Sequence, residues 1–141
     1  MTWRWVSEAA ALAIHGEQLA EHGGGTGIRD EGLLESALAR PRNLAAYSDC
    51  GAAQLAAAYA FGIARDHPFV DGNKRTAFIA AATFLLLNGF DVTPSEKDVV
   101  ETFLRLAASE LTEEQLAAWF SACMVRKDEK THEKDNKPNH R

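Results

Sequence analysis

The chain has 141 residues, which is enough for one domain whose hydrophobic core needs neither disulfides nor a structural metal. Fifteen Lys and Arg residues against twenty Asp and Glu residues give a net charge of −5. Six basic and four acidic residues fall in segment 126–141, which leaves nine basic against sixteen acidic residues in the rest of the chain. This balance argues against a nucleic-acid-binding surface, because phosphate binding normally requires a basic face.

Nothing in the sequence predicts export or membrane insertion. The first residues lack the charged, apolar and small-residue regions of a signal peptide. The longest apolar run, 77–87, is too short to cross a bilayer. Cys50 and Cys123 have no metal-type spacing; one disulfide between them stays open, and two reduced thiols are the favoured interpretation. We therefore expect a soluble, cytoplasmic protein.

Helical periodicity dominates the N-terminal half. Ser7 is a suitable N-cap for a first helix, which the glycines at 23–25 would end. Asp30 is a suitable cap for a second helix, which we expect to end before Pro41 because proline disfavours helical backbone at the preceding residue. Segment 42–51 has no helical stripe and predicts either a loop or a small β-hairpin.

The sequence also predicts helices in the centre and in the C-terminal half of the chain. Segments 52–66 and 73–88 are apolar on nearly every face, which predicts two buried helices that cross the middle of the domain. Segment 94–98 resembles a helix start, and Thr112 with Gln115 forms the pattern of a capping box. Two further helices from these starts would close the core.

The predicted fold class is therefore all-α: a compact bundle of about six to seven helices around two buried central ones, with a possible small β-hairpin flap. We place this domain at residues 1–125. Segment 126–141 is charged and almost free of apolar residues, so it cannot bury enough surface to offset its ordering entropy and is predicted to be a disordered tail.

The most informative segment is 67–76, His-Pro-Phe-Val-Asp-Gly-Asn-Lys-Arg-Thr, which links the two central helices. Pro68 prevents the first helix from continuing, and Gly72 allows the backbone to approach a ligand closely. The N–H groups at the start of the next helix, at the positive end of its dipole, form an anion site. Lys74 and Arg75 add positive charge, Arg75 with a forked geometry that suits phosphate oxygens.

Two further side chains indicate chemistry at this anion site. Asp71 beside a phosphate requires a cation between them, and Mg²⁺ fits that arrangement. His67 can act as a general base near neutral pH and accept a proton from a target hydroxyl. Each residue alone has a structural explanation, since Asp-Gly-Asn is a common turn and capping string. A turn needs neither His nor Lys-Arg, so the combination predicts phosphoryl or nucleotidyl transfer from a metal-bound triphosphate.

Two other patterns do not predict a site. His15 and His22 share the first helix stripe but are seven residues apart, too far for one metal ion, and we interpret both as packing or partly exposed residues. The glycine-rich segment 23–27 is followed by no Lys-Ser/Thr pair and preceded by no strand, so it is a helix-ending loop rather than a phosphate-binding loop.

The motif resembles the signature of the Fic/Doc superfamily, in particular its Doc (death-on-curing) branch. Segments 27–30, 32–38 and 87–89 are also similar to Doc-type sequences, and the resemblance covers roughly residues 3–121. It implies a small all-helical Fic fold and a cytoplasmic toxin that is restrained by an antitoxin encoded beside it. Segment 42–51 has the right place in the chain for the substrate-aligning hairpin of Fic enzymes.

The resemblance also implies roles for single residues. His67 would be the catalytic base, Asp71 the metal carboxylate, and Gly72, Asn73 and Arg75 the phosphate cradle, with Arg75 acting in catalysis as well. The implied ligands are ATP and Mg²⁺.

Two positions depart from the wider Fic pattern. Lys74 replaces a glycine in the cradle, and Phe78 replaces the last arginine. Doc-type proteins share both departures, which implies that ATP presents its γ-phosphate to His67. The implied reaction is phosphorylation of a protein hydroxyl, with elongation factor Tu as the target, which would arrest translation. Two alternatives stay open: an AMP transferase on the same scaffold, and a Fic-like binding module without chemistry.

Overall fold

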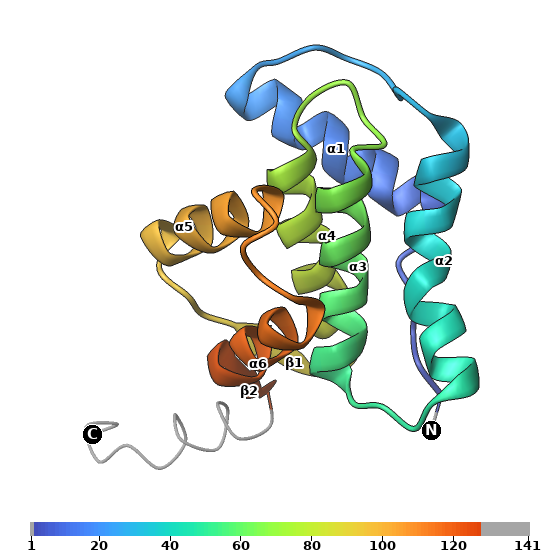
Figure 1. Cartoon of the computed structure of the whole chain (residues 1–141), viewed down its shortest axis with the longest axis vertical. Coiled ribbons are helices and arrows are strands. Elements are labelled where there is room, and N and C mark those ends of the chain that lie inside the picture. The colour runs from blue at the N-terminus through green and yellow to red at the C-terminus, as the bar shows by residue number, and fades with distance from the viewer. Residues whose placement is uncertain (1, 128–141) are drawn as a thin grey trace, which may run out of the picture.

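The computed structural model describes residues 2–127. In that range it contains six α-helices and one two-stranded sheet, which confirms the all-α fold class (Figure 1). The elements in chain order are α1 (Glu8–His22), α2 (Glu31–Tyr47), α3 (Ala52–Asp66), α4 (Asn73–Leu87), β1 (Phe90–Val92), α5 (Glu96–Ala107), α6 (Glu113–Cys123) and β2 (Met124–Arg126). Among the described residues, no helix combines the length and the apolar character that a membrane span requires.

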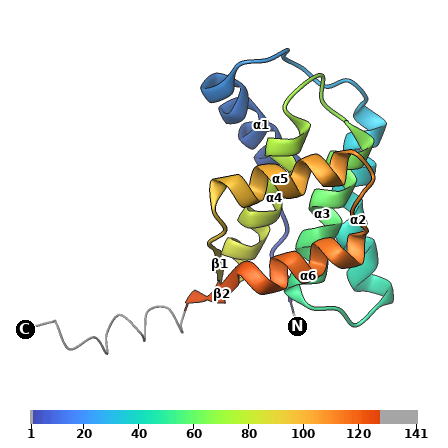
Figure 2. The same cartoon turned by 60° about the vertical axis from the view of Figure 1, so that its left-hand side comes forward.

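The two predicted central helices, α3 and α4, pack antiparallel in the middle of the molecule (Figures 1 and 2). α2 and α6 pack against α3, α1 packs against α4, and α5 contacts both central helices. All residues of α3 from 55 to 60 are buried, so this helix has no polar face over that stretch. Such a helix is stable only when it is covered on all sides, which explains its central position.

Side-chain caps begin the helices where the sequence predicts them. The Ser7 and Asp30 side chains accept hydrogen bonds from backbone N–H groups at the starts of α1 and α2. Thr112 and Gln115 form a reciprocal capping box at the start of α6. These bonds satisfy N–H groups that have no partner within their own helix.

The prediction that the second helix ends before Pro41 is wrong. Segment 42–51 forms no hairpin: residues 42–47 belong to α2, and only 48–51 form a loop. α2 continues through Pro41 to Tyr47, although proline removes the hydrogen bond to the Ala37 carbonyl. The reason is packing: Pro41 is buried, and the partly buried Leu44 packs against the hydrophobic core one turn further on. Gly62 of α3 allows this close approach, because a Cβ there would lie 3.2 Å from the Cα of Ala37.

A short antiparallel sheet joins the end of α4 to the end of α6. In its register, Phe90 lies opposite Arg126, and the Arg126 guanidinium lies 5.4 Å from the centre of the Phe90 ring. Lys127 continues the pairing by donating its backbone N–H to the Gly89 carbonyl. Arg126 therefore belongs to the folded domain rather than to the tail, and the rest of the predicted tail, 128–141, lies outside the described residues.

The N-terminal segment is fastened to the two central helices. Trp3, Trp5 and Tyr59 surround Phe84, with ring centroids 5.4–5.8 Å from it. The Tyr59 hydroxyl accepts the backbone N–H of Val6 at 2.9 Å, and both residues are buried. One hydroxyl group thus satisfies a main-chain donor that has no access to water.

Replacing Tyr59 with Phe is expected to destabilise the fold by about 1–3 kcal/mol, because the buried Val6 N–H loses its acceptor. Urea unfolding followed by circular dichroism would measure the change. Tyr47→Phe is the matched control, since Tyr47 is 88% exposed and its hydroxyl faces solvent. Equal stability of the two variants would mean that the Tyr59 hydroxyl makes no net contribution.

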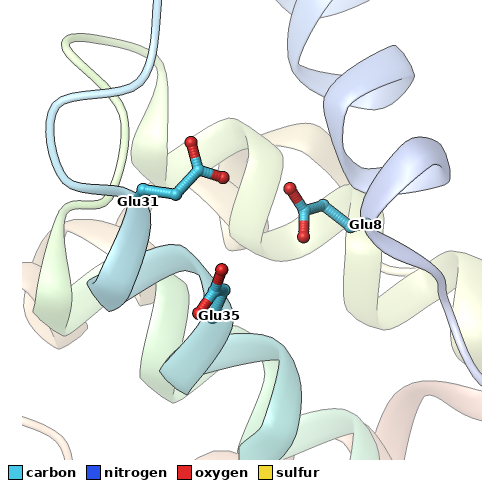
Figure 3. A group of neighbouring side chains, drawn as sticks. All are labelled: Glu8, Glu31 and Glu35. Atoms are coloured by element: carbon cyan, nitrogen blue, oxygen red, sulfur yellow. The ribbon is translucent and has the colours of Figure 1, made fainter.

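Three exposed carboxylates, those of Glu8, Glu31 and Glu35, meet between α1 and α2, with their oxygen atoms within 4.8 Å of one another (Figure 3). A hydrogen bond with Glu8 raises the pKa of Glu31, with smaller contributions from desolvation and charge repulsion. The folded state therefore holds this proton more tightly than the unfolded chain. The raised pKa of Glu31 lowers stability at neutral pH; this loss shrinks as the pH falls below the raised pKa and is gone below the ordinary value of 4.5.

Replacing Glu8 with Gln is expected to lower the pKa of Glu31, because the shared hydrogen bond and the neighbouring charge are removed. A carboxyl ¹³C NMR titration would measure this pKa. Glu17→Gln, on the same helix but outside the cluster, should leave it unchanged. If the pKa of Glu31 is the same in both variants as in the wild type, Glu8 is not the cause of its shift.

Candidate active site

One cavity of about 440 Å³ brings all the predicted site residues together at the junction of α3 and α4. They are His67, Asp71, Gly72, Asn73, Lys74 and Arg75. The opposite wall belongs to α5 and is apolar; its residues are Val99, Val100, Phe103 and Leu104. The sequence predicted the polar half of this cavity but not the apolar half, because nothing local to α5 indicates which element it faces.

His67 is the C-cap residue that directly follows α3, and its exposed side chain lines the cavity. Its backbone is left-handed (φ 51°, ψ 58°), and its N–H bonds to the Ile63 carbonyl. This conformation is unfavourable for a residue with a Cβ, so neighbouring contacts must hold it. Arg29 does so: its Nε donates to the His67 carbonyl at 2.6 Å and its Nη2 to the Asp66 carbonyl at 2.8 Å.

The segment that lies along the motif is the link between α1 and α2, not segment 42–51. The Pro68 carbonyl accepts the N–H groups of Arg29 and Asp30, and the Val70 N–H donates to the Gly27 carbonyl. These bonds form a short antiparallel bridge between Ile28 and Phe69. The motif loop is thus held by main-chain hydrogen bonds to a segment about forty residues earlier in the chain.

Asp71 is oriented by three hydrogen bonds. Its Oδ1 accepts the Gly72 N–H at 2.8 Å, its Oδ2 accepts the Gly25 N–H at 3.4 Å, and its carbonyl oxygen lies 2.8 Å from Nε2 of His15. The close approach of the glycine segment requires the absence of a side chain, since a Cβ on Gly24 would lie 2.8 Å from Oδ2. Neither His15 nor Gly25 was expected at the site.

The Asn73 side chain holds the loop closed. Its Oδ1 accepts the Phe69 N–H and its Nδ2 donates to the Phe69 carbonyl, both at 3.0 Å, and the residue is buried. What Asn73 can offer a ligand is therefore its backbone N–H. The Gly72 N–H is already used by Asp71, so the three donors at the start of α4 that have no helical partner are those of Asn73, Lys74 and Arg75.

These three N–H groups make an anion site that two cations reinforce. They lie at the positive end of the α4 dipole, and no side chain caps this helix. Lys74 and Arg75 are exposed in the same cavity, and within residues 2–127 neither forms an ion pair. The site can therefore hold the phosphate groups of a nucleotide.

Asp71 fits the metal-binding role. It is exposed in the cavity beside this cationic site, yet within the described residues it pairs with neither Lys74 nor Arg75. Mg²⁺ prefers oxygen ligands, typically one or two carboxylates together with phosphate oxygens and water. Asp71 would hold that ion together with phosphate oxygens and water.

The Phe78 side chain is not part of the cavity wall. Its ring packs against Phe103, Trp119 and Phe120, with ring centroids 5.7–6.5 Å apart. This position, where the wider Fic pattern has an arginine, is part of the hydrophobic core that joins α4 to α5 and α6. α4 thus offers no phosphate clamp one turn beyond Arg75.

Both cysteines are free thiols away from this cavity. Burial and the nearby Asp98 raise the pKa of Cys123 to about 11. Burial and the Asp49 charge raise the pKa of Cys50 as well. Neither thiol is suited to act as a nucleophile, because the reactive thiolate form is disfavoured.

Comparison with known proteins agrees with this geometry. Residues 5–85, which include the motif, match the Fic/DOC family. The chain is 39% identical over 112 residues to Toxin Doc of Mycolicibacterium smegmatis, covering 73% of this chain and 85% of that protein. It is 34% identical over 93 residues to Protein kinase doc of Escherichia phage P1, covering 65% of this chain and 74% of that protein. This chain therefore belongs to the Fic/Doc family.

Proposed function

We propose that this protein is the toxin of a toxin–antitoxin pair and that it transfers the γ-phosphate of ATP to a hydroxyl group of elongation factor Tu. The observation that carries the proposal is the arrangement of the cavity. An exposed base, a carboxylate and three free backbone N–H groups with two cations all face one space. Phosphoryl transfer requires little more than positioning and charge stabilisation, and these groups supply both.

In the proposed reaction, a ring nitrogen of His67 accepts the proton of the target hydroxyl. The hydroxyl oxygen forms a bond to the γ-phosphorus, the bond to the β-γ bridging oxygen breaks, and ADP leaves with that electron pair. The N–H groups at the start of α4, with Lys74 and Arg75, stabilise the negative charge on the phosphate oxygens. Mg²⁺ held by Asp71 would neutralise part of the same charge.

Phosphate transfer is favoured over AMP transfer by the place of Phe78. AMP transfer would need the β- and γ-phosphates held firmly as the leaving group. The position that would supply a further cation for them carries Phe78, which is packed among aromatic rings. The relative named Protein kinase doc supports the same choice.

The proposed partner is an antitoxin that is encoded next to this chain. The proposed location is the cytoplasm, where the toxin would arrest translation. The relative named Toxin Doc supports this pairing. The acidic charge of the chain agrees with a protein partner rather than a nucleic acid.

The test is the intact mass of elongation factor Tu after incubation with this protein, ATP and Mg²⁺. A gain of one phosphate supports the proposal. A gain of one AMP would show that AMP transfer, the wider Fic reaction, operates here. No gain at any ATP concentration would reject elongation factor Tu as the substrate and favour a binding module.

A further inference from the structure

We infer that His15 is a positioning residue that sets the orientation of the Asp71 carboxylate from beneath the motif loop. The inference rests on the proposed function, in which Asp71 holds the metal ion. His15 lies in α1, 56 residues before Asp71, and only 5% of its surface is exposed. It does not line the cavity, so its contact with the site runs through the motif loop.

The His15 ring is fixed in one place and in one tautomer. It stacks on the Phe69 ring with a centroid distance of 3.8 Å and an angle of 9° between the ring planes. Its Nε2 lies 2.8 Å from the Asp71 carbonyl oxygen, which can only accept. Nε2 therefore carries the proton, and His15 donates to Asp71.

The planarity of the peptide bond transmits this contact to the carboxylate. The carbonyl of Asp71 and the N–H of Gly72 belong to one rigid peptide unit. When His15 holds the carbonyl oxygen, the N–H is fixed on the opposite side of that unit. This N–H donates to Oδ1 of Asp71 at 2.8 Å, so the same peptide unit that His15 anchors also holds the side chain.

A second contact completes the support, because the Gly25 N–H holds Oδ2. Gly72 permits the arrangement, because its φ of 79° lies in the left-handed region that residues with a side chain rarely adopt. Without the His15 donor, the 71–72 peptide unit can rotate, and Asp71 loses the N–H that fixes its carboxylate. Loss of such outer contacts typically weakens metal binding by about 10–100-fold.

The experiment compares His15→Phe with His15→Gln in the full-length protein. Phe keeps the stacking on Phe69 but has no donor, whereas the Gln side chain can place an N–H near the position of Nε2. His22→Phe is the control, since His22 is an exposed histidine on the same helix. Thermal unfolding would first show that each variant is folded.

Two measurements decide the outcome. The ¹⁵N order parameter of the Gly72 amide is expected to fall from about 0.85 toward about 0.6 in His15→Phe and to return in His15→Gln. The second is calorimetry with a non-hydrolysable ATP analogue, with and without Mn²⁺, an ion that also prefers oxygen ligands. Mn²⁺ should increase the affinity of the wild-type protein for the analogue. This increase should be smaller by about tenfold or more in His15→Phe and should recover in His15→Gln.

An unchanged Gly72 order parameter in folded His15→Phe would overturn the inference. An equally large fall of this order parameter in His15→Gln would overturn it too. If the wild-type protein binds no nucleotide, the proposed function fails. The order parameters, which need no ligand, then still support or reject the positioning role.

Discussion

Replacing His67 with Asn is expected to reduce phosphorylation of elongation factor Tu by at least about 10²–10⁴-fold while the protein stays folded, because the general base is lost. Asn is the appropriate replacement here. The backbone at this position is left-handed, with φ 51°, and Asn tolerates that conformation better than other residues with a side chain. The backbone contacts of residue 67 with Ile63 and Arg29 involve only its N–H and carbonyl, so they should persist.

The measurement is the initial rate of phosphate incorporation at saturating ATP, with the unfolding midpoint of each variant determined in parallel. His67→Ala should be equally inactive but less stable than His67→Asn, since Ala in this conformation costs about 1–2 kcal/mol. A His67→Asn variant that retains the wild-type rate would remove His67 from the reaction and leave the binding-module alternative.

Replacing Asp71 with Asn is expected to lower the rate by about 10²-fold or more, because a metal ion at such a site contributes several kcal/mol to transition-state stabilisation. The substitution is nearly isosteric, and the Asn carbonyl oxygen can still accept the Gly72 N–H that Oδ1 accepts in the wild type. What is lost is the negative charge and the acceptor for Gly25. Additional Mg²⁺ should restore little of the rate, and chelation of Mg²⁺ should abolish it in the wild type.

Asp66→Asn provides the matched control, because this carboxylate lies five residues earlier and outside the cavity. Its backbone carbonyl, which accepts from Arg29, is unchanged by the substitution. Equal losses in Asp66→Asn and Asp71→Asn would point to a general effect of charge on this end of the molecule, and the proposed metal role of Asp71 would then be wrong.

Much of the fold was predictable from local patterns. The bounds of α3 agree with the apolar segment 52–66, and α4 begins at Asn73 as predicted. Both are recognisable because buried helices lack a polar face and because Pro68 and Gly72 separate them. The side chains at Ser7, Asp30 and Thr112 also marked helix starts correctly, since caps act within three residues.

The errors have a common cause. Pro41 disfavours a helix locally, yet the burial of Pro41 and the packing of Leu44 on the hydrophobic core outweigh the lost hydrogen bond. The pairing of β1 with β2 joins residues 32 to 36 positions apart, and three-residue strands leave no periodic pattern. In each case the deciding contact is distant in the sequence.

The chemistry proposed for the site was readable from the sequence alone, because the proposed base, carboxylate, amides and cations fall within the nine residues 67–75. Their order places them around one helix N-terminus in any fold where α3 and α4 are antiparallel neighbours. The contacts that hold this loop, in contrast, become visible only in the folded structure. Arg29 fixes the strained backbone of His67, His15 and Gly25 orient Asp71, and α5 closes the cavity. The three hydrogen bonds join residues 38–56 positions apart, and each involves a main-chain N–H or carbonyl. Such groups are present in nearly every residue, so the sequence does not indicate which of them will be used.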